Sequence, residues 1–297
     1  MYKQLSQLLM YGDLDQDGIL YQLGEIFHRY DKGDYDRMEL VRDINIQIKH
    51  LLKVATDYGF DDNLWHNYLT FFLMMSENPF SMTCEKVGAS EGTVNLLVEN
   101  DFRIFKSLFD YDFSKIEKDL GIDCFSRISN YHAISKKDLM YNKNVSEKVR
   151  ALSKKLENTT TEQEFFDVVT GFYKDYGVGM FGLNKAFRIE ENPAGGVIFR
   201  PINNMDQVML DDLVGYEIQK KKLVDNTEAF VQGRKANNCL LFGDSGTGKS
   251  TSIKAIVNQY YDQGLRMIEI YKHQFKDLSR VIADIKNRNY RFIIYMD

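Results

Sequence analysis

The sequence predicts an α+α/β protein, in which a helical N-terminal domain is followed by an incomplete three-layer α/β domain. Residues from about 19 to 190 repeat apolar side chains at gaps of three and four, which is the helical period. From residue 213 onward, short apolar runs alternate with amphipathic stretches, as strands and helices do around a parallel sheet. We therefore expect a helical domain over 1–190, a linker with a short strand over 191–212, and the α/β domain over 213–297.

The helical period is clearest in three runs, from Met38 to Val54, from Leu64 to Met75 and from Val94 to Phe109. A fourth helix, over 162–175, is predicted by a capping-box pattern, because Thr161 is followed three residues later by Glu164.

The pattern changes at the linker. Pro193, Gly195 and Gly196 interrupt it, and the apolar residues 197–199 are expected to form a short strand. Helices are then predicted at 216–232, 249–263 and 275–288, and strands at 239–242, 265–270 and 292–296.

Composition narrows the class of protein. Hydrophobic residues make up 44% of the 297 residues and charged residues 27%, as in ordinary globular proteins. The net charge of −5 argues against a broad basic surface for nucleic acid. The apolar run 68–75 is far shorter than the ~20 residues that span a bilayer, so no membrane partner is expected. Three widely spaced cysteines favour reduced thiols and a cytoplasmic protein.

The segment 243–250, GDSGTGKS, matches the phosphate-loop pattern G-x-x-x-x-G-K-[ST], with an apolar run before it and a helical pattern after it. Glycines permit the turns of such a loop, and its amides and the helix N-terminus attract phosphate. Lys249 is expected to reach the β- and γ-phosphates, and the Ser250 hydroxyl to ligate Mg²⁺. The expected nucleotide-binding residues of the loop are Gly243, Asp244, Ser245, Gly246, Thr247, Gly248, Lys249, Ser250 and Thr251. The alternative is a glycine-rich turn in which Lys-Ser occurs by accident.

The last apolar run, in RFIIYMD, leads into Asp297. In phosphate-loop NTPases a second apolar strand brings an acid to the same end of the sheet, where it holds Mg²⁺. Asp297 is therefore the candidate second metal ligand beside Ser250, and the candidate catalytic residue beside Lys249. The alternative is a surface aspartate that closes an ordinary strand.

The chain from about Leu213 onward resembles the AAA+ class of P-loop ATPases. It is still more similar to a bacterial family of inferred AAA+-type ATPases that is labelled by a domain of unknown function. This similarity extends upstream into YGVGMFGLNKAFRI and, more loosely, into SENPFSMTCEKVG. The resemblance implies that Val214 and Gly215 lie where AAA+ proteins close over the adenine. It also implies that Asp297 is the first acid of the Walker B strand.

The second acid, polar sensor, arginine finger and helical lid of AAA+ proteins are not found in the sequence. We therefore expect the front part of a longer ATPase, which binds ATP and Mg²⁺ but hardly hydrolyses ATP. The resemblance also implies a homo-oligomer for the full-length protein. In that protein, ATP hydrolysis would drive conformational work. The alternative function is a nucleotide-gated interaction module, whose helical domain binds an unidentified protein partner.

Overall fold

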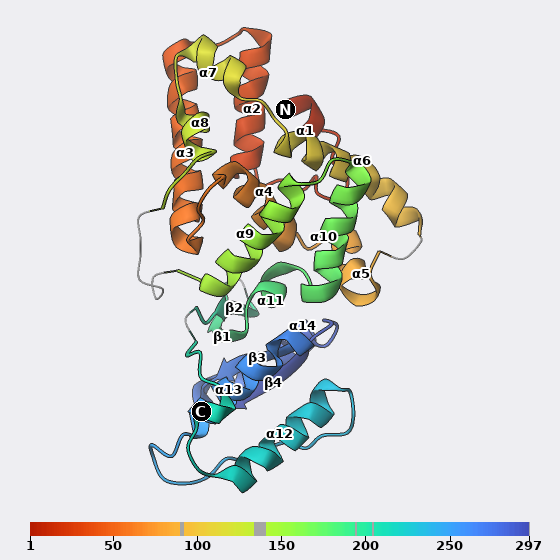
Figure 1. Ribbon diagram of the computed structural model, residues 1–297, viewed down its shortest axis with the longest axis vertical. Coiled ribbons are helices and arrows are strands. Elements are labelled where there is room, and N and C mark those ends of the chain that lie inside the picture. The colour runs from red at the N-terminus through yellow and green to blue at the C-terminus, as the bar shows by residue number, and fades with distance from the viewer. Residues whose placement is uncertain (90–91, 134–140, 194, 204, 297) are drawn as a thin grey trace. The chain divides into compact units, whose positions relative to one another are not determined.

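The computed structural model describes residues 1–89, 92–133, 141–193, 195–203 and 205–296. The chain forms two compact units, Met1–Gly179 and Met180–Asp297 (Figure 1). The first unit is helical and the second carries a sheet. The helices of the first unit are α1 (Tyr2–Leu5), α2 (Ile19–Lys32), α3 (Arg37–Tyr58), α4 (Leu64–Met75), α5 (Pro79–Val87), α6 (Thr93–Phe109), α7 (Ser114–Leu120), α8 (Cys124–Ile128), α9 (Lys143–Glu157) and α10 (Glu162–Tyr176).

The ends of these helices follow the capping residues in the sequence. Thr161 Oγ1 accepts a hydrogen bond from Glu164 N at 3.1 Å, and Glu164 Oε2 accepts one from Thr161 N at 3.2 Å. This confirms the capping box predicted for α10. At α3, Asp36 accepts from Glu39 N at 2.9 Å, and Gly59 ends the helix with a left-handed φ of 65°.

Aromatic side chains fill the core of the helical unit. Trp65 of α4, the single tryptophan, is 2% exposed, and its Nε1 donates to Leu108 O at 2.8 Å. Phe102 and Phe105 of α6 meet Tyr11 edge to face, with ring centroids 5.9 and 5.3 Å apart. These contacts explain the apolar period of α4 and α6.

A buried carboxylate attaches the N-terminal segment to this core. Asp101 of α6 is fully buried, and its two oxygens accept from the backbone amides of Leu9, Met10 and Tyr11 at 2.8–3.1 Å. A buried charge is tolerable only when hydrogen bonds replace its lost hydration. Asp101 therefore fixes a segment about 90 residues away along the chain.

The second unit begins near α11 (Gly179–Leu183) and contains a four-stranded mixed sheet in the order β2-β1-β3-β4. β1 (Ala186–Glu191) and β2 (Val197–Pro201) form an antiparallel pair. β3 (Leu265–Ile270) runs parallel to β1, and β4 (Arg291–Met296) runs parallel to β3. The strands expected at 197–199, 265–270 and 292–296 are confirmed, and together with the helices they bear out an α+α/β class.

Helices cover both faces of this sheet. On one face, α13 (Lys249–Tyr260) and α12 (Glu217–Val231) pack against alternate strand residues that include Leu265 and Ile293. On the other face, α14 (Leu278–Ile285) and Phe181 pack against Ile268, Ile270, Phe292 and Ile294. Short 3₁₀ turns at Leu210–Asp212, Tyr261–Gln263 and Lys272–Asp277 connect these layers. The helix expected at 275–288 is thus a 3₁₀ turn followed by the shorter α14.

Strand β1 corrects the sequence-based expectation, which placed residues up to 190 among the helices. Phe187 and Ile189 are buried on one face, while Arg188 and Glu190 carry the opposite, charged face. Arg188 pairs with Glu269 of β3 at 2.5 Å, and Glu190 pairs with Arg200 of β2 at 2.9 Å. The strand is stabilised by partners on both sides, one of which lies about 80 residues further along the chain.

One arginine is built into the interior of the second unit. Arg266 of β3 is 2% exposed, and its guanidinium lies 4.1 Å from the ring centroid of Tyr261 and 4.6 Å from that of Tyr290. It donates to Phe181 O at 2.6 Å and to the carbonyls of Tyr261 and Leu265 at 2.9 Å. This arrangement satisfies a buried cation with aromatic faces and carbonyl oxygens.

Among the described residues, no helix combines the length and the apolar character that crossing a membrane requires.

Candidate nucleotide-binding site

The loop at 243–248 has a backbone that favours glycine at three positions. Gly243, Gly246 and Gly248 have φ values of 144°, 81° and 81°, in the region that L side chains rarely adopt. A Cβ at Gly246 or Gly248 would meet no atom within 4 Å, so backbone conformation and not crowding requires glycine there. The open space beside these positions is what close approach of a ligand needs.

The loop leads directly into the first turn of α13. Gly248 is the N-cap of this helix and offers no side-chain cap. At the N-terminus of α13, as in any α-helix, the first backbone amides have no acceptor within the helix itself. Free amides at a helix N-terminus carry partial positive charge, and an anion such as phosphate satisfies them.

The ammonium of Lys249 closes back over the loop. Its Nζ donates to Gly243 O at 2.9 Å and to Asp244 O at 2.7 Å, and lies 3.4 Å from Thr247 Oγ1. Thr247 Oγ1 also donates to Asp244 O at 2.8 Å. The lysine ammonium therefore lies at the loop. Its present acceptors are neutral oxygens, which bind an ammonium less strongly than the charged oxygens of a phosphate, so a phosphate can replace them.

The hydroxyl of Ser250, in the first turn of α13, lies 2.8 Å from the hydroxyl of Tyr295 on β4. This contact brings the helix that follows the loop to the carboxyl end of β4. Tyr295 also packs in an apolar cluster with Ile253 of α13 and Leu241, which precedes the loop. The segment before the loop and the helix after it thus both meet the distant strand β4 at Tyr295.

The other expected site residues lie as follows. Asp244 and Ser245 are exposed in the loop, and Thr251 is half-buried in the first turn of α13. Val214 is 95% exposed and Gly215 has a left-handed φ of 84°, both in the segment before α12. In the described part of the chain no hydrogen bond joins Val214 or Gly215 to the loop, so their role toward an adenine stays a prediction. Asp297 lies outside the described residues; Met296, at the end of β4, is the nearest described position.

The strand expected at 239–242 is wrong. Among the described residues, no strand pairs with this segment, and the side chains of Leu240 and Phe242 are 85% and 87% exposed. Asn226 of α12 holds the preceding turn instead, exchanging hydrogen bonds with the amide and carbonyl of Asn237 at 2.9 Å. An apolar run becomes a strand only where a neighbour completes its ladder, and β4 does not pair with this one.

The donor set fits a magnesium nucleotide. An ammonium and the amides of a helix N-terminus suit phosphate oxygens, and a serine hydroxyl beside them is a hard oxygen ligand of the kind that Mg²⁺ prefers. The open space at Gly246 and Gly248 leaves room for the phosphates. The carboxylate that would complete the metal ligands is expected from Asp297, whose placement is not described.

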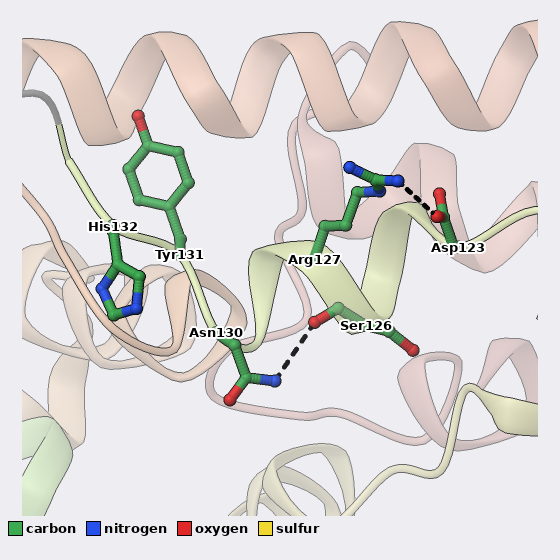
Figure 2. A pocket seen from close by; sticks show the side chains of 6 residues that line it. All are labelled: Asp123, Ser126, Arg127, Asn130, Tyr131 and His132. Atoms are coloured by element: carbon green, nitrogen blue, oxygen red, sulfur yellow. Dashed lines mark hydrogen bonds and ion pairs between the residues drawn. The ribbon is translucent and has the colours of Figure 1, made fainter.

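A pocket of about 530 Å³ lies in the helical unit, lined by Asp123, Ser126, Arg127, Asn130, Tyr131 and His132 (Figure 2). Its charged groups satisfy one another, because Arg127 pairs with Asp123 at 2.7 Å. Asn130 donates to Ser126 O at 3.3 Å. The Arg127 and Asp123 side chains are 76% and 66% exposed, so nothing here concentrates charge for a ligand.

Tyr295 is the site residue that sequence reasoning missed. It stands two positions before Asp297 in an apolar run, and period-two alternation places it on the same face of β4 as Ile293. The sequence does contain a signal for this residue, because Tyr295 places a hydroxyl on a strand face whose other positions are apolar.

No curated protein matches the chain, and no solved structure matches it. Residues 183–297, which carry the strands, match the model of a family described as a protein of unknown function, DUF815.

Proposed function

We propose that residues 243–250 are a phosphate-binding loop that holds ATP with Mg²⁺, and that the protein is an AAA+-type ATPase. The observation that carries the proposal is the geometry at the point where the loop 243–248 leads into α13. Three glycines in conformations that disfavour side chains lead into α13, and Lys249 and Ser250 occupy its first turn. The spacing, the backbone and the helix N-terminus all support the same ligand.

Each residue has a defined task in this proposal. The amides of the loop donate to the phosphates, and the Lys249 ammonium exchanges its loop oxygens for β- and γ-phosphate oxygens. Ser250 supplies one ligand of the metal, and Asp297 a second through water. The bound Mg²⁺ neutralises charge that develops on the phosphates. Hydrolysis of the bound ATP would then drive conformational work.

Binding of a fluorescent ATP analogue in Mg²⁺ tests the proposal directly. Lys249→Ala removes charge-assisted hydrogen bonds to phosphate, so its affinity is expected to fall by about tenfold or more. Lys254→Ala is the matched control, because Lys254 lies on the same helix but pairs with Asp206 at 2.7 Å, and its affinity should not change. Equal affinity of wild type and Lys249→Ala, with both folded by circular dichroism, would refute the phosphate loop. Competition by ATP and GTP then distinguishes the nucleotides.

A second function, a nucleotide-gated interaction module, is favoured by apolar side chains on the helical unit. Val87 at the end of α5 and Leu96 at the start of α6 are 62% and 67% exposed. Exposed apolar residues of this kind are available to a protein partner. Nucleotide-dependent retention of a partner by wild type, without turnover of ATP, would favour this module over the ATPase.

A further inference from the structure

We propose that Tyr295 is a positioning residue that sets the Ser250 hydroxyl for the metal. The inference rests on the proposed function, since it concerns the Mg²⁺ that accompanies the nucleotide. Its basis is the 2.8 Å contact between Ser250 Oγ and Tyr295 Oη, in which either hydroxyl is able to donate.

The tyrosine hydroxyl is a fixed point because its ring is held independently of Ser250. The ring packs against a cluster whose buried members include Ile253, Val257 and Met267, with Leu241 at its edge. β4, which carries the ring, is paired with β3 along its whole length. Ser250, by contrast, is exposed in the first turn of α13, so its rotamer has little packing to define it.

The chemistry of two hydroxyls explains how this contact serves a metal. A serine hydroxyl has one proton and two acceptor lone pairs. When a lone pair binds a divalent cation, the O–H becomes a stronger donor and requires an acceptor. Tyr295 Oη lies at the right distance to accept that proton, which leaves the lone pairs of Ser250 for the metal.

The pair can also reverse its polarity by rotating both O–H bonds without moving a heavy atom. Without metal, Tyr295 donates to Ser250 in a neutral hydrogen bond; with metal, Ser250 donates to Tyr295 in a polarised, stronger one. Tyr295 thus stabilises the metal-bound state more than the free state. A phenyl ring of the same shape keeps the packing and loses this difference.

The test is the affinity for the fluorescent ATP analogue, measured once in Mg²⁺ and once in EDTA. Tyr295→Phe is expected to lower the affinity about fivefold in Mg²⁺ and to leave it unchanged in EDTA. Tyr260→Phe is the matched control, because it removes a hydroxyl that bonds Glu228 at 2.9 Å near the other end of α13. It should leave the Mg²⁺ dependence intact.

A double-mutant cycle shows whether Tyr295 acts through Ser250. If it does, Tyr295→Phe combined with Ser250→Ala weakens Mg²⁺-dependent binding no more than Ser250→Ala alone. Additive losses would overturn the inference, as would tighter binding by Tyr295→Phe, which would mean that the tyrosine occupies the metal's place.

The two proposals fail in distinguishable ways. Wild-type binding that depends on Lys249 and Mg²⁺ but is unaffected by Tyr295→Phe overturns the role of Tyr295 alone. Absence of Lys249-dependent binding in the wild type overturns both.

Discussion

Asp101 offers the sharpest test of how the helical unit is held together. Replacing it by asparagine keeps the size and shape of the side chain but removes the charge. It also turns one acceptor oxygen into a donor that faces backbone amides. The amides of Leu9, Met10 and Tyr11 all point at this carboxylate at 2.8–3.1 Å.

The expected loss follows from these three contacts. A hydrogen bond to a charged group contributes about 1.5–3 kcal/mol and a neutral one about 0.5–1.5 kcal/mol. Losing charge assistance at three amides, of which two are partly buried, gives a decrease of about 2–3 kcal/mol in the free energy of unfolding.

Urea unfolding followed by the fluorescence of Trp65 measures this loss, since the single tryptophan is buried in the same unit. Asp110→Asn is the control. It removes an exposed pair with Lys106 at the end of the same helix and should change the free energy of unfolding by less than about 0.5 kcal/mol. A loss below about 1 kcal/mol in Asp101→Asn would refute the reasoning, because the amides would then be satisfied without the charge.

Two further substitutions test the interior. Arg266→Met should destabilise the strand-bearing unit by about 2–4 kcal/mol, because the substitution leaves the carbonyls of Phe181 and Tyr261 without their donor. Hydrogen exchange of the β3 amides measures this loss of stability. Unchanged protection of these amides would contradict the prediction. Burial lowers the pKa of His66, so protons bind the unfolded chain more tightly than the folded one. The helical unit should therefore lose stability as pH falls through about 6.5. In unfolding followed by Trp65 fluorescence, His66→Gln should make the free energy of unfolding depend less on pH. An unchanged pH dependence would show that other titrating groups cause it.

Local patterns predicted the elements whose partners lie nearby. The capping box of Thr161 and Glu164 set the start of α10, and the apolar run 265–270 coincided with β3. In both cases the information lies within a few residues of the element.

The misses share one physical cause, which is dependence on distant partners. Residues 186–191 are a strand because β3 and β2 lie on either side, and their alternation of apolar and charged side chains covers only the four residues 187–190. Residues 239–242 have the composition of a strand but no described neighbour to pair with. The contact of Tyr295 with Ser250 joins residues 45 positions apart, which no local pattern encodes.

The same separation of partners affects how the chain folds during synthesis. The β1–β2 hairpin is local and can form as soon as its residues are free, within microseconds. Its third strand, β3, ends at Ile270, 69 residues after β2 ends at Pro201, and a ribosome adding 5–20 residues per second delivers it about 3–14 s later. During that interval Phe187 and Ile189 lack their sheet neighbour, and the hairpin presents an unpaired edge. The nascent protein is therefore most prone to aggregation, and most dependent on chaperones, between the synthesis of β2 and that of β3.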